Sequence, residues 1–302
     1  MLKNRTVALF GEVLVDVFPD REILGGAPFN VARHLQAFGA SPILITRTGN
    51  DKTREALLSE MDRLGMDQRG IQNDMNHPSG RVEVVMEGAS HRFEILPDQA
   101  YDHIHAGLVH MIALAARPQL IYFGTLAQRS AASRRALSAL FSSCDCPRFL
   151  DINLRSPWYD MHTIRRSLKR ADILKLNREE LDRIAPLLHL SGSMEQKAEA
   201  LARQYGLEQI LITCGEEGAW HFGKGSASLH SESEKAMLAD TVGAGDGFSA
   251  VFILGMLCNW PIELSLARAN AFAAAVCGIR GAAPEDPAFY EPFLTEWLCT
   301  SS

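Results

Sequence analysis

The sequence predicts an α/β protein with a mostly parallel central sheet and helices on both faces. Short runs rich in β-branched and aromatic residues alternate with segments of helical periodicity over most of the 302 residues. Alternation of this kind is typical of parallel sheets covered by helices, in which ligands bind at the carboxyl ends of the strands. No repeat period and no low-complexity segment interrupts it, so we expect one domain over residues 1–302.

The first half of the chain holds two strand-like runs, each followed by a helical pattern. Strands are expected at 6–18 and 41–49, and helices at 30–39 and 51–65. Asp51 is placed to cap the second helix, and Gly39 and Gly65 are placed to end the two helices.

The second half continues the alternation. Strands are expected at 119–124, 147–153, 171–177 and 208–215, and helices at 130–142, 178–188 and 194–206. The segment 79–99 breaks the rhythm, because two β-type runs surround Gly88, Ala89 and Ser90 as in a hairpin. Composition alone leaves two interpretations of this hairpin open, a flap over a site or an edge hairpin of the main sheet.

Composition and charge exclude several classes of protein. The formal net charge is -6 with a pI near 5.9, and no basic block stands out, so nucleic acid is not an expected partner. The N-terminus does not resemble a signal peptide, and no apolar stretch reaches the roughly 20 residues of a membrane span. We therefore expect a cytoplasmic protein without membrane contact.

The spacing of the cysteines and histidines does not indicate a metal site. The six cysteines are scattered along the chain, as expected for reduced thiols in a cytosolic protein. His103, His105 and His110 come nearest to a histidine cluster, and we expect them to be surface side chains.

The segment 238–257 carries the strongest chemical signal. Gly243, Ala244 and Gly245 let backbone N–H groups approach a ligand closely, and a long apolar helix follows whose N-terminus attracts anions. Asp246 stands where that helix begins. An anion hole beside a carboxylate suits phosphoryl transfer, in which the carboxylate takes the hydroxyl proton. A capping Asp after a glycine-rich turn is the structural alternative, and this stretch alone does not separate the two.

Five motifs in order resemble the ribokinase (PfkB) family of carbohydrate kinases. "ILGGAPFNVARHLQAFGA" (23–40) and "DTVGAGDGFSAVF" (240–252) resemble its N-terminal and C-terminal signatures. Between them, "DINLR" (151–155), "NREE" (177–180) and "TCGEEG" (213–218) resemble its D-x-N-x-R, N-x-x-E and T-x-G-x-x-G elements. The resemblance covers residues 7 to about 290. It implies a ribokinase-like fold with a small β lid, which 79–99 would form, and an ATP-dependent sugar kinase.

The resemblance also implies roles for individual residues. Asp246 corresponds to the catalytic base, and the N–H groups of Gly243, Ala244 and Gly245 correspond to the anion hole. The implied sugar ligands are Asp16, Gly26, Asn30 and Arg155, to which we add Arg92 of the flap. The nucleotide residues are Asn177, Thr213, Gly215, Gly218 and Asn270. Glu180 is associated with Mg²⁺ through water, and a monovalent cation, K⁺, is implied at Asp240, Val242, Val276 and Gly281.

Each of these residues has a structural alternative. Asp16 could cap a turn, Asn30 could cap the helix at 31–38, and Glu180 could be a helix-surface carboxylate like Glu179 beside it. Arg155 could be a solvated loop residue. The functional interpretation depends on the ordered set and not on any one member.

The substrate is less well defined. "DINLRSPWY" resembles the D-P-N-L-R-x-x-x-W run of fructokinases, but it has Ile152 in place of Pro and Trp158 about one residue early. On the basis of this resemblance, fructose is the expected substrate. The alternative is 2-keto-3-deoxygluconate, because Arg81 and Arg92 place two cations in the flap. From another class, the alternative is a sugar-sensing binding protein without catalysis. Lids in this family often pair, so a homodimer through the flap is also expected.

Overall fold

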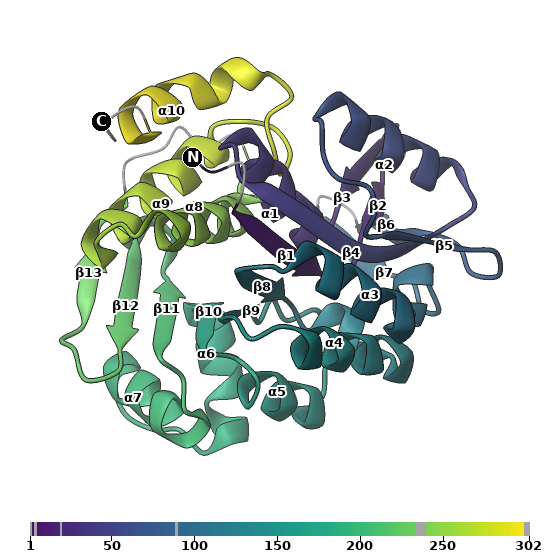
Figure 1. Ribbon diagram of the computed structural model, residues 1–302. Helices are drawn as coiled ribbons and strands as arrows, with labels where there is room; N and C mark the ends of the chain where they lie inside the picture. Colours follow the sequence, from purple (N-terminus) through teal and green to yellow (C-terminus); the bar gives the residue numbers. More distant parts are fainter. Residues whose placement is uncertain (1, 3–4, 19, 88–89, 234–239, 299–302) are drawn as a thin grey trace.

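The computed structural model describes residues 2, 5–18, 20–87, 90–233 and 240–298, without the side chains of 84–92 and 298. In these ranges a large twisted sheet lies between two layers of helices, and a smaller sheet stands beside one end of it (Figure 1). This is the α/β architecture that the alternation of the sequence predicts.

The main sheet has nine strands within the described residues, in the order β13-β12-β11-β10-β9-β8-β1-β4-β5. Neighbours from β11 to β5 are parallel, and β12 and β13 extend the sheet in antiparallel pairing. The bounds are β1 Thr6–Phe10, β4 Ser41–Gly49, β5 Ile71–Asp74, β8 Leu120–Phe123, β9 Arg148–Asp151, β10 Ile173–Asn177, β11 Gln209–Thr213, β12 Ala219–Gly223 and β13 Leu229–Ser231.

Two hydrophobic cores lie on the two faces of this sheet, because alternate strand residues point to opposite sides. In β1, Val7 and Leu9 belong to one core and Ala8 and Phe10 to the other. The core of Val7 packs against α1 Ala27–Ala37, α2 Lys52–Arg63, α8 Ala244–Cys258, α9 Ile262–Cys277 and α10 Glu291–Leu298. The other packs against α3 Ala106–Ala116, α4 Ala131–Ser143, α5 Met161–Leu168, α6 Arg178–Ile184 and α7 Met194–Tyr205.

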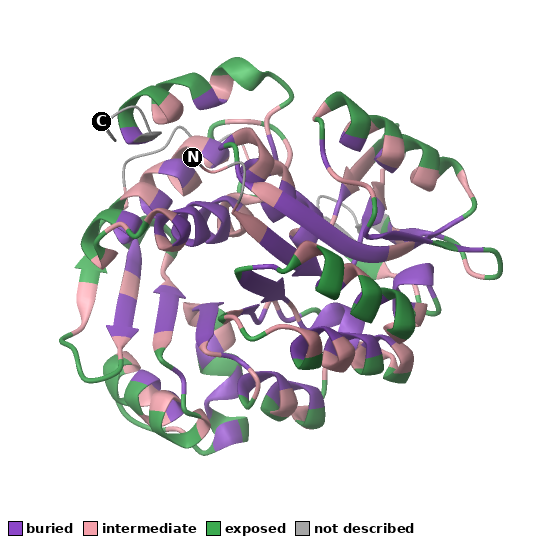
Figure 2. Ribbon diagram, in the orientation of Figure 1, coloured by how far each residue is buried: buried purple, intermediate pink, exposed green. Residues whose placement is uncertain are grey.

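Short 3-10 helices complete the described elements: η2 Ala100–His103, η3 Leu126–Arg129, η4 Pro186–Leu188, η5 Gly215–Glu217 and η6 Pro287–Tyr290. Figure 2 shows that the inner strands of the main sheet are mostly buried, whereas the edge strand β13 and the outer sides of the helices are exposed or partly exposed. In the described ranges, no helix combines the length and the apolar character needed to cross a bilayer.

The smaller sheet, which we call the lid, has the strand order β3-β2-β6-β7 in the described residues. Its strands are β2 Leu14–Val17, β3 Glu22–Gly25, β6 Gly80–Glu87 and β7 Ser90–Ile95. The expected hairpin at 79–99 is present as the antiparallel pair β6 and β7, and β2 pairs with β6 in parallel. The hairpin is therefore part of a separate sheet and not an edge of the main one.

Two sequence-based boundaries were wrong. The run 6–18 forms two strands in different sheets, since a pattern of alternating residues does not register a change of partner strand. The helix expected at 30–39 begins earlier, at Ala27, with Pro28 in its first turn. Proline is tolerated there because the N–H groups of the first turn have no acceptor within the helix. Asn30 consequently lies inside the helix and does not cap it.

The expected cap at Asp51 is present and connects α2 to the entrance of the lid. Asp51 Oδ1 accepts the N–H of Arg54 at 3.1 Å, and Asp51 Oδ2 accepts the N–H of Ser79 at 2.8 Å, immediately before β6. The Ser79 hydroxyl donates to Asp51 Oδ1 at 2.7 Å.

We predict that Asp51→Ala lowers the free energy of unfolding by about 1–3 kcal/mol, because it removes a helix cap and leaves the buried Ser79 N–H without its acceptor. Urea denaturation measures the loss. Glu55→Ala, an exposed carboxylate in the first turn of the same helix, is the matched control and should cost less than about 1 kcal/mol. Equal losses for the two variants would contradict the role assigned to Asp51.

Candidate active site

The N-terminal ends of α1 and α8 meet at the carboxyl edge of the main sheet. Asp246 lies in the first turn of α8, and its Oδ2 accepts a 2.8 Å hydrogen bond from Asn30 Nδ2 of α1. The two residues are 216 positions apart in the sequence. The structure thus brings together one residue from each of the two family signatures.

The carboxyl group of Asp246 lies among several charged groups. Burial raises the pKa of its carboxyl group to about 6, and the Asn30 hydrogen bond opposes this rise. Among the neighbouring charges, Asp151 raises the pKa while Lys175 and Arg155 lower it. A carboxylate with a pKa near the working pH accepts a proton more readily than an ordinary one.

Gly243 gives the start of α8 its shape. It is the N-cap residue with φ 83°, and a Cβ added there would lie 2.4 Å from the Cα of Ala282. The N–H of Ala244 makes a long, 3.4 Å contact with the carbonyl of Thr241. Because the first N–H groups of a helix have no intrahelical acceptor, this turn presents donors and a partial positive charge beside Asp246.

A buried ion pair that was not predicted from the sequence lies directly beneath this turn. Lys175 Nζ of β10 is 3.1 Å from both carboxylate oxygens of Asp151 at the end of β9. The same nitrogen would be 3.0 Å from a Cβ at Gly245. Burial alone would lower the pKa of Lys175, but Asp151, Glu180 and Asp246 outweigh it and raise the pKa. A lysine in an otherwise apolar strand was the available signal.

Carboxylates also gather on the side of the lid. Asp16 lies on β2, and burial raises its pKa to about 6, against the effect of Arg155. Gly26 has φ 113°, and a Cβ there would lie 2.6 Å from the carbonyl oxygen of Glu12. Glu12 itself was not predicted, although a carboxylate just after a buried strand at the carboxyl edge is a signal.

Glu12 and Asn30 have unused hydrogen-bonding capacity. Both are buried, and neither Glu12 Oε2 nor Asn30 Oδ1 has a hydrogen-bond partner among the described residues. Burial raises the pKa of Glu12 to about 7, while Arg155 lowers it and Asp246 raises it, so these groups share one electrostatic environment. Buried acceptors of this kind suit a polyhydroxylated ligand.

Of the two arginines predicted to bind the sugar, the structure describes the side chain of one. Arg155 follows β9, is exposed, and acts electrostatically on Asp16, Glu12 and Asp246. Arg92 lies on β7, and its side chain is outside the described part of the structure. Its role stays a prediction.

A cavity of about 690 Å³ opens on the other side of the α8 N-terminus. It contains four predicted nucleotide residues, Thr213, Gly215, Gly218 and Asn270, together with Glu216, Ser233, Thr241, Ala244, Gly245, Phe248, Ala273, Ala274 and Cys277. Asn270 Nδ2 donates to the carbonyl of Ser231 at 2.8 Å. Since Ala244 and Gly245 line the cavity, a ligand in it would reach the first N–H groups of α8.

Asn177 and Glu180 form a capping box at the start of α6 rather than an open ligand pair. Asn177 Oδ1 accepts the N–H of Glu180 at 2.8 Å, and Glu180 Oε2 accepts the N–H of Asn177 at 2.9 Å. Glu180 Oε1 accepts the N–H of Leu154 at 2.8 Å. Because both carboxylate oxygens are already engaged, contact with Mg²⁺ through water fits better than direct coordination.

The predicted cation residues lie together behind the anion hole. Asp240 Oδ1 accepts the N–H of Val242 at 3.0 Å, and Asp240 Oδ2 accepts the N–H of Gly281 at 3.3 Å. The Asp240 N–H donates to the carbonyl of Cys277, next to Val276 at the end of α9. Because both Asp240 oxygens already accept backbone N–H groups, a hard cation here would also have to use backbone carbonyl oxygens as ligands.

The fold and this site define a ribokinase-like carbohydrate kinase class, and comparison with known proteins agrees. Residues 3–288 match the model of the pfkB family carbohydrate kinases. The Escherichia coli fructokinase is 28% identical over 275 residues, which cover 83% of this chain and 84% of that protein.

Solved structures of sugar kinases share the fold of this chain. The crystal structure of an uncharacterized sugar kinase from Pyrococcus horikoshii in complex with ATP has a TM-score of 0.73 at 26% identity, covering 91% of this chain and 93% of that one. The Vibrio cholerae fructokinase with fructose, ADP and calcium ion has a TM-score of 0.79 at 21% identity, covering 96% and 99%. The chain belongs to the pfkB family of carbohydrate kinases, and membership implies a phosphotransferase.

We predict that Gly243→Ala lowers turnover by at least 10²-fold, because a Cβ would collide with Ala282 and displace the anion-hole donors. A phosphoryl-transfer assay at saturating substrates measures it. Gly39→Ala is the matched control, since Gly39 has φ 84° but open space around its Cβ position. Both variants lose about 1 kcal/mol of stability to backbone strain. If Gly39→Ala lost as much turnover, strain alone would explain the effect.

Proposed function

We propose that this protein is an ATP-dependent sugar kinase in which Asp246 removes the proton of the attacking hydroxyl. One observation carries the proposal. Asp246, with a raised pKa, stands between the cavity at the α8 N-terminus and the buried acceptors of Glu12 and Asn30. A hydroxyl bound on the lid side therefore reaches the base and a phosphate in the cavity together.

The roles of the other residues follow from their chemistry. Asn30 orients the Asp246 carboxylate, and Glu12 and Asp16 accept hydroxyl protons of the sugar. The first N–H groups of α8 and the charge of Lys175 stabilise the negative charge on the transferring phosphoryl group. Removal of the hydroxyl proton by Asp246 leaves the oxygen free to bond to phosphorus as the bond to ADP breaks.

ATP is the proposed phosphoryl donor, with its base and ribose in the cavity lined by Thr213, Gly218 and Asn270. The Pyrococcus horikoshii relative carries ATP in its crystal structure, which supports the proposal. Mg²⁺ would neutralise the phosphate charge, held through water near Glu180.

Fructose is the proposed acceptor. Support comes from the fructokinases among the relatives and from the "DINLR" motif. 2-Keto-3-deoxygluconate is the second candidate. Arg155 acts electrostatically on the proposed sugar ligand Asp16, and a carboxylated sugar would use such a cation. A sugar sensor has no need of a base with a raised pKa, so the placement of Asp246 favours an enzyme. Closure of the lid over the sugar and dimerisation through its edge strands β3 and β7 also remain predictions.

The test is a coupled assay of ADP release over a panel of sugars that includes fructose and 2-keto-3-deoxygluconate. We predict that Asp246→Asn lowers kcat by about 10²–10⁴-fold and leaves sugar affinity nearly intact. In the unaltered enzyme, kcat/KM should rise with pH through about 6, because only the ionised carboxyl group accepts a proton.

A stability measurement accompanies that assay. Folding raises the pKa of Asp246 from 3.8 to about 6, so the folded state favours the protonated form and loses stability as pH rises between these values. Asp246→Asn should therefore unfold no more easily than the unaltered enzyme at pH 8. Turnover near that of the unaltered enzyme would reject Asp246 as the base, and release of ADP with none of the sugars would reject the kinase.

We predict that K⁺ raises the activity when it replaces Na⁺ at constant ionic strength. A cation at Asp240 would hold the 241–245 backbone in its donor geometry from behind. Asp240→Asn weakens the site and should remove the difference between the two ions, while activity without K⁺ changes less. Identical rates of the unaltered enzyme in the two buffers would contradict a K⁺ site.

A further inference from the structure

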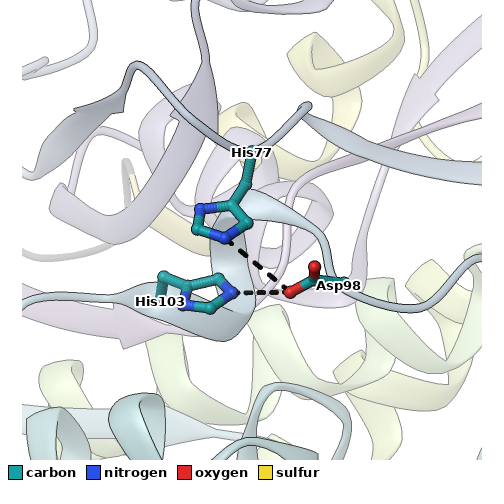
Figure 3. Close-up of side chains that lie close together, drawn as sticks. All are labelled: His77, Asp98 and His103. Atoms are coloured by element: carbon teal, nitrogen blue, oxygen red, sulfur yellow. Dashed lines mark hydrogen bonds and ion pairs between the residues drawn. The ribbon is translucent and has the colours of Figure 1, made fainter.

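Three side chains that could ligate a metal converge where the lid joins the main domain. His77 lies just before β6, and Asp98 and His103 lie just after β7 (Figure 3). His103 Nε2 is 2.8 Å and His77 Nε2 is 3.8 Å from the same oxygen, Asp98 Oδ1. All three ligand atoms lie within 4.8 Å of one another. Residues on the two arms of the hairpin thus share one point in space.

The two imidazole rings are arranged side by side. Their centroids are 3.6 Å apart with an angle of 12° between the planes, and both Nε2 atoms are directed toward Asp98 (Figure 3). Each ring nitrogen that faces Asp98 is a possible ligand atom. Neighbouring ligands of one Zn²⁺ ion lie about 3–4 Å apart, because each bond is about 2.0–2.2 Å long. Of the two distances to Asp98, 3.8 Å lies within this range and 2.8 Å lies just below it.

A second carboxylate sets the orientation of His77. His77 Nδ1 is 3.1 Å from Asp74 Oδ2, whose residue is buried and is also held by Arg47 Nε at 2.8 Å. When Nδ1 donates its proton to Asp74, Nε2 keeps its lone pair and faces Asp98. Carboxylate–histidine pairs of this kind fix the tautomer and the ring orientation of metal-bound histidines.

The cluster is open to solvent on one side. The exposed fractions of the side chains are 26% for His77, 32% for His103 and 73% for Asp98. Asp98 has φ 54°, a region that Asp and Asn tolerate better than most residues. An ion can thus enter from water and complete its coordination with water molecules.

We propose that His77, Asp98 and His103 form a binding site for a divalent transition-metal ion such as Zn²⁺. Two imidazoles and one carboxylate suit Zn²⁺, Co²⁺ or Ni²⁺, whereas Mg²⁺ and Ca²⁺ prefer oxygen ligands. Coordination turns the two ring planes apart, because each metal–nitrogen bond lies in the plane of its ring. The site is separate from the Glu180 and Asp240 positions, which belong to other strands and loops.

Its position gives the ion a mechanical role at the base of the lid. The entry to β6 is fixed by the Ser79–Asp51 hydrogen bonds. The exit from β7 is fixed by Trp158 Nε1 on the carbonyl of Ile95 at 3.1 Å and by Arg129 Nη2 on the carbonyl of Leu96 at 2.8 Å. An ion bound to His77 and Asp98 joins these two arms directly, so it restricts the motion of the hairpin relative to the main domain.

The test is calorimetric titration of the full, tag-free chain with Zn²⁺ in excess Mg²⁺, which fills the oxygen sites, without nucleotide or sugar. We expect one ion per chain, and Co²⁺ in its place should give the visible absorption bands of bound imidazole. Asp98→Asn and His103→Ala should each weaken binding by at least 10-fold. His110→Ala, an exposed histidine of α3 outside the cluster, is the matched control and should bind as the unaltered protein does.

Each other outcome overturns the proposal. If the ion bound equally well to Asp98→Asn and His103→Ala, the ligands would lie elsewhere. If binding were lost only in Glu180→Gln, the ion would belong to the nucleotide side. Asp98→Asn preserves size and backbone tolerance, so an unchanged melting temperature without metal shows that its loss of binding is not unfolding. The expected increase of the melting temperature with Zn²⁺ should be absent in that variant.

Discussion

Beneath the start of α8, the buried ion pair between Asp151 and Lys175 connects most of the elements that form the site. Asp151 also accepts hydrogen bonds from Ser249 of α8 at 3.0 Å and from Tyr122 of β8 at 3.3 Å. One carboxylate therefore aligns β8, β9 and β10 with the helix that carries Asp246. Removal of one partner of a buried ion pair costs about 3–5 kcal/mol, since it leaves the other charge without compensation. In the proposed kinase, the anion hole would depend on this pair for its position and for part of its positive charge.

The same concentration of buried charge lowers the stability of the folded state. Burial raises the pKa values of Glu12, Asp16 and Asp246 toward neutrality. Each of these groups favours its protonated form when folded, so its own contribution to stability falls as pH rises from about 4 to about 7. Active sites often retain such groups because the reaction uses them. A buried carboxylate whose ionised form is unfavourable readily accepts the proton of a hydroxyl.

The lid adds a second sheet whose strands come from two distant parts of the sequence, 14–25 and 80–95. It carries Asp16, and it is attached to the main domain by buried lid residues such as Leu14 and Val82 and by hydrogen bonds at the ends of β6 and β7. Asp51, Arg129 and Trp158 supply hydrogen bonds there. The His77–Asp98–His103 cluster lies at the same junction.

Local signals determined much of this protein from sequence alone. The cap at Asp51, the alternation of strands and helices and the small residues before Asp246 act over a few positions, so the fold class, the family and the start of a helix at these small residues could be predicted. Long-range pairing was decided by the tertiary structure. It separated β1 from β2, placed Asn30 against Asp246, set Lys175 under Gly245 and joined His77 to Asp98 and His103. These contacts depend on how distant segments pack, and no short-range periodicity encodes that.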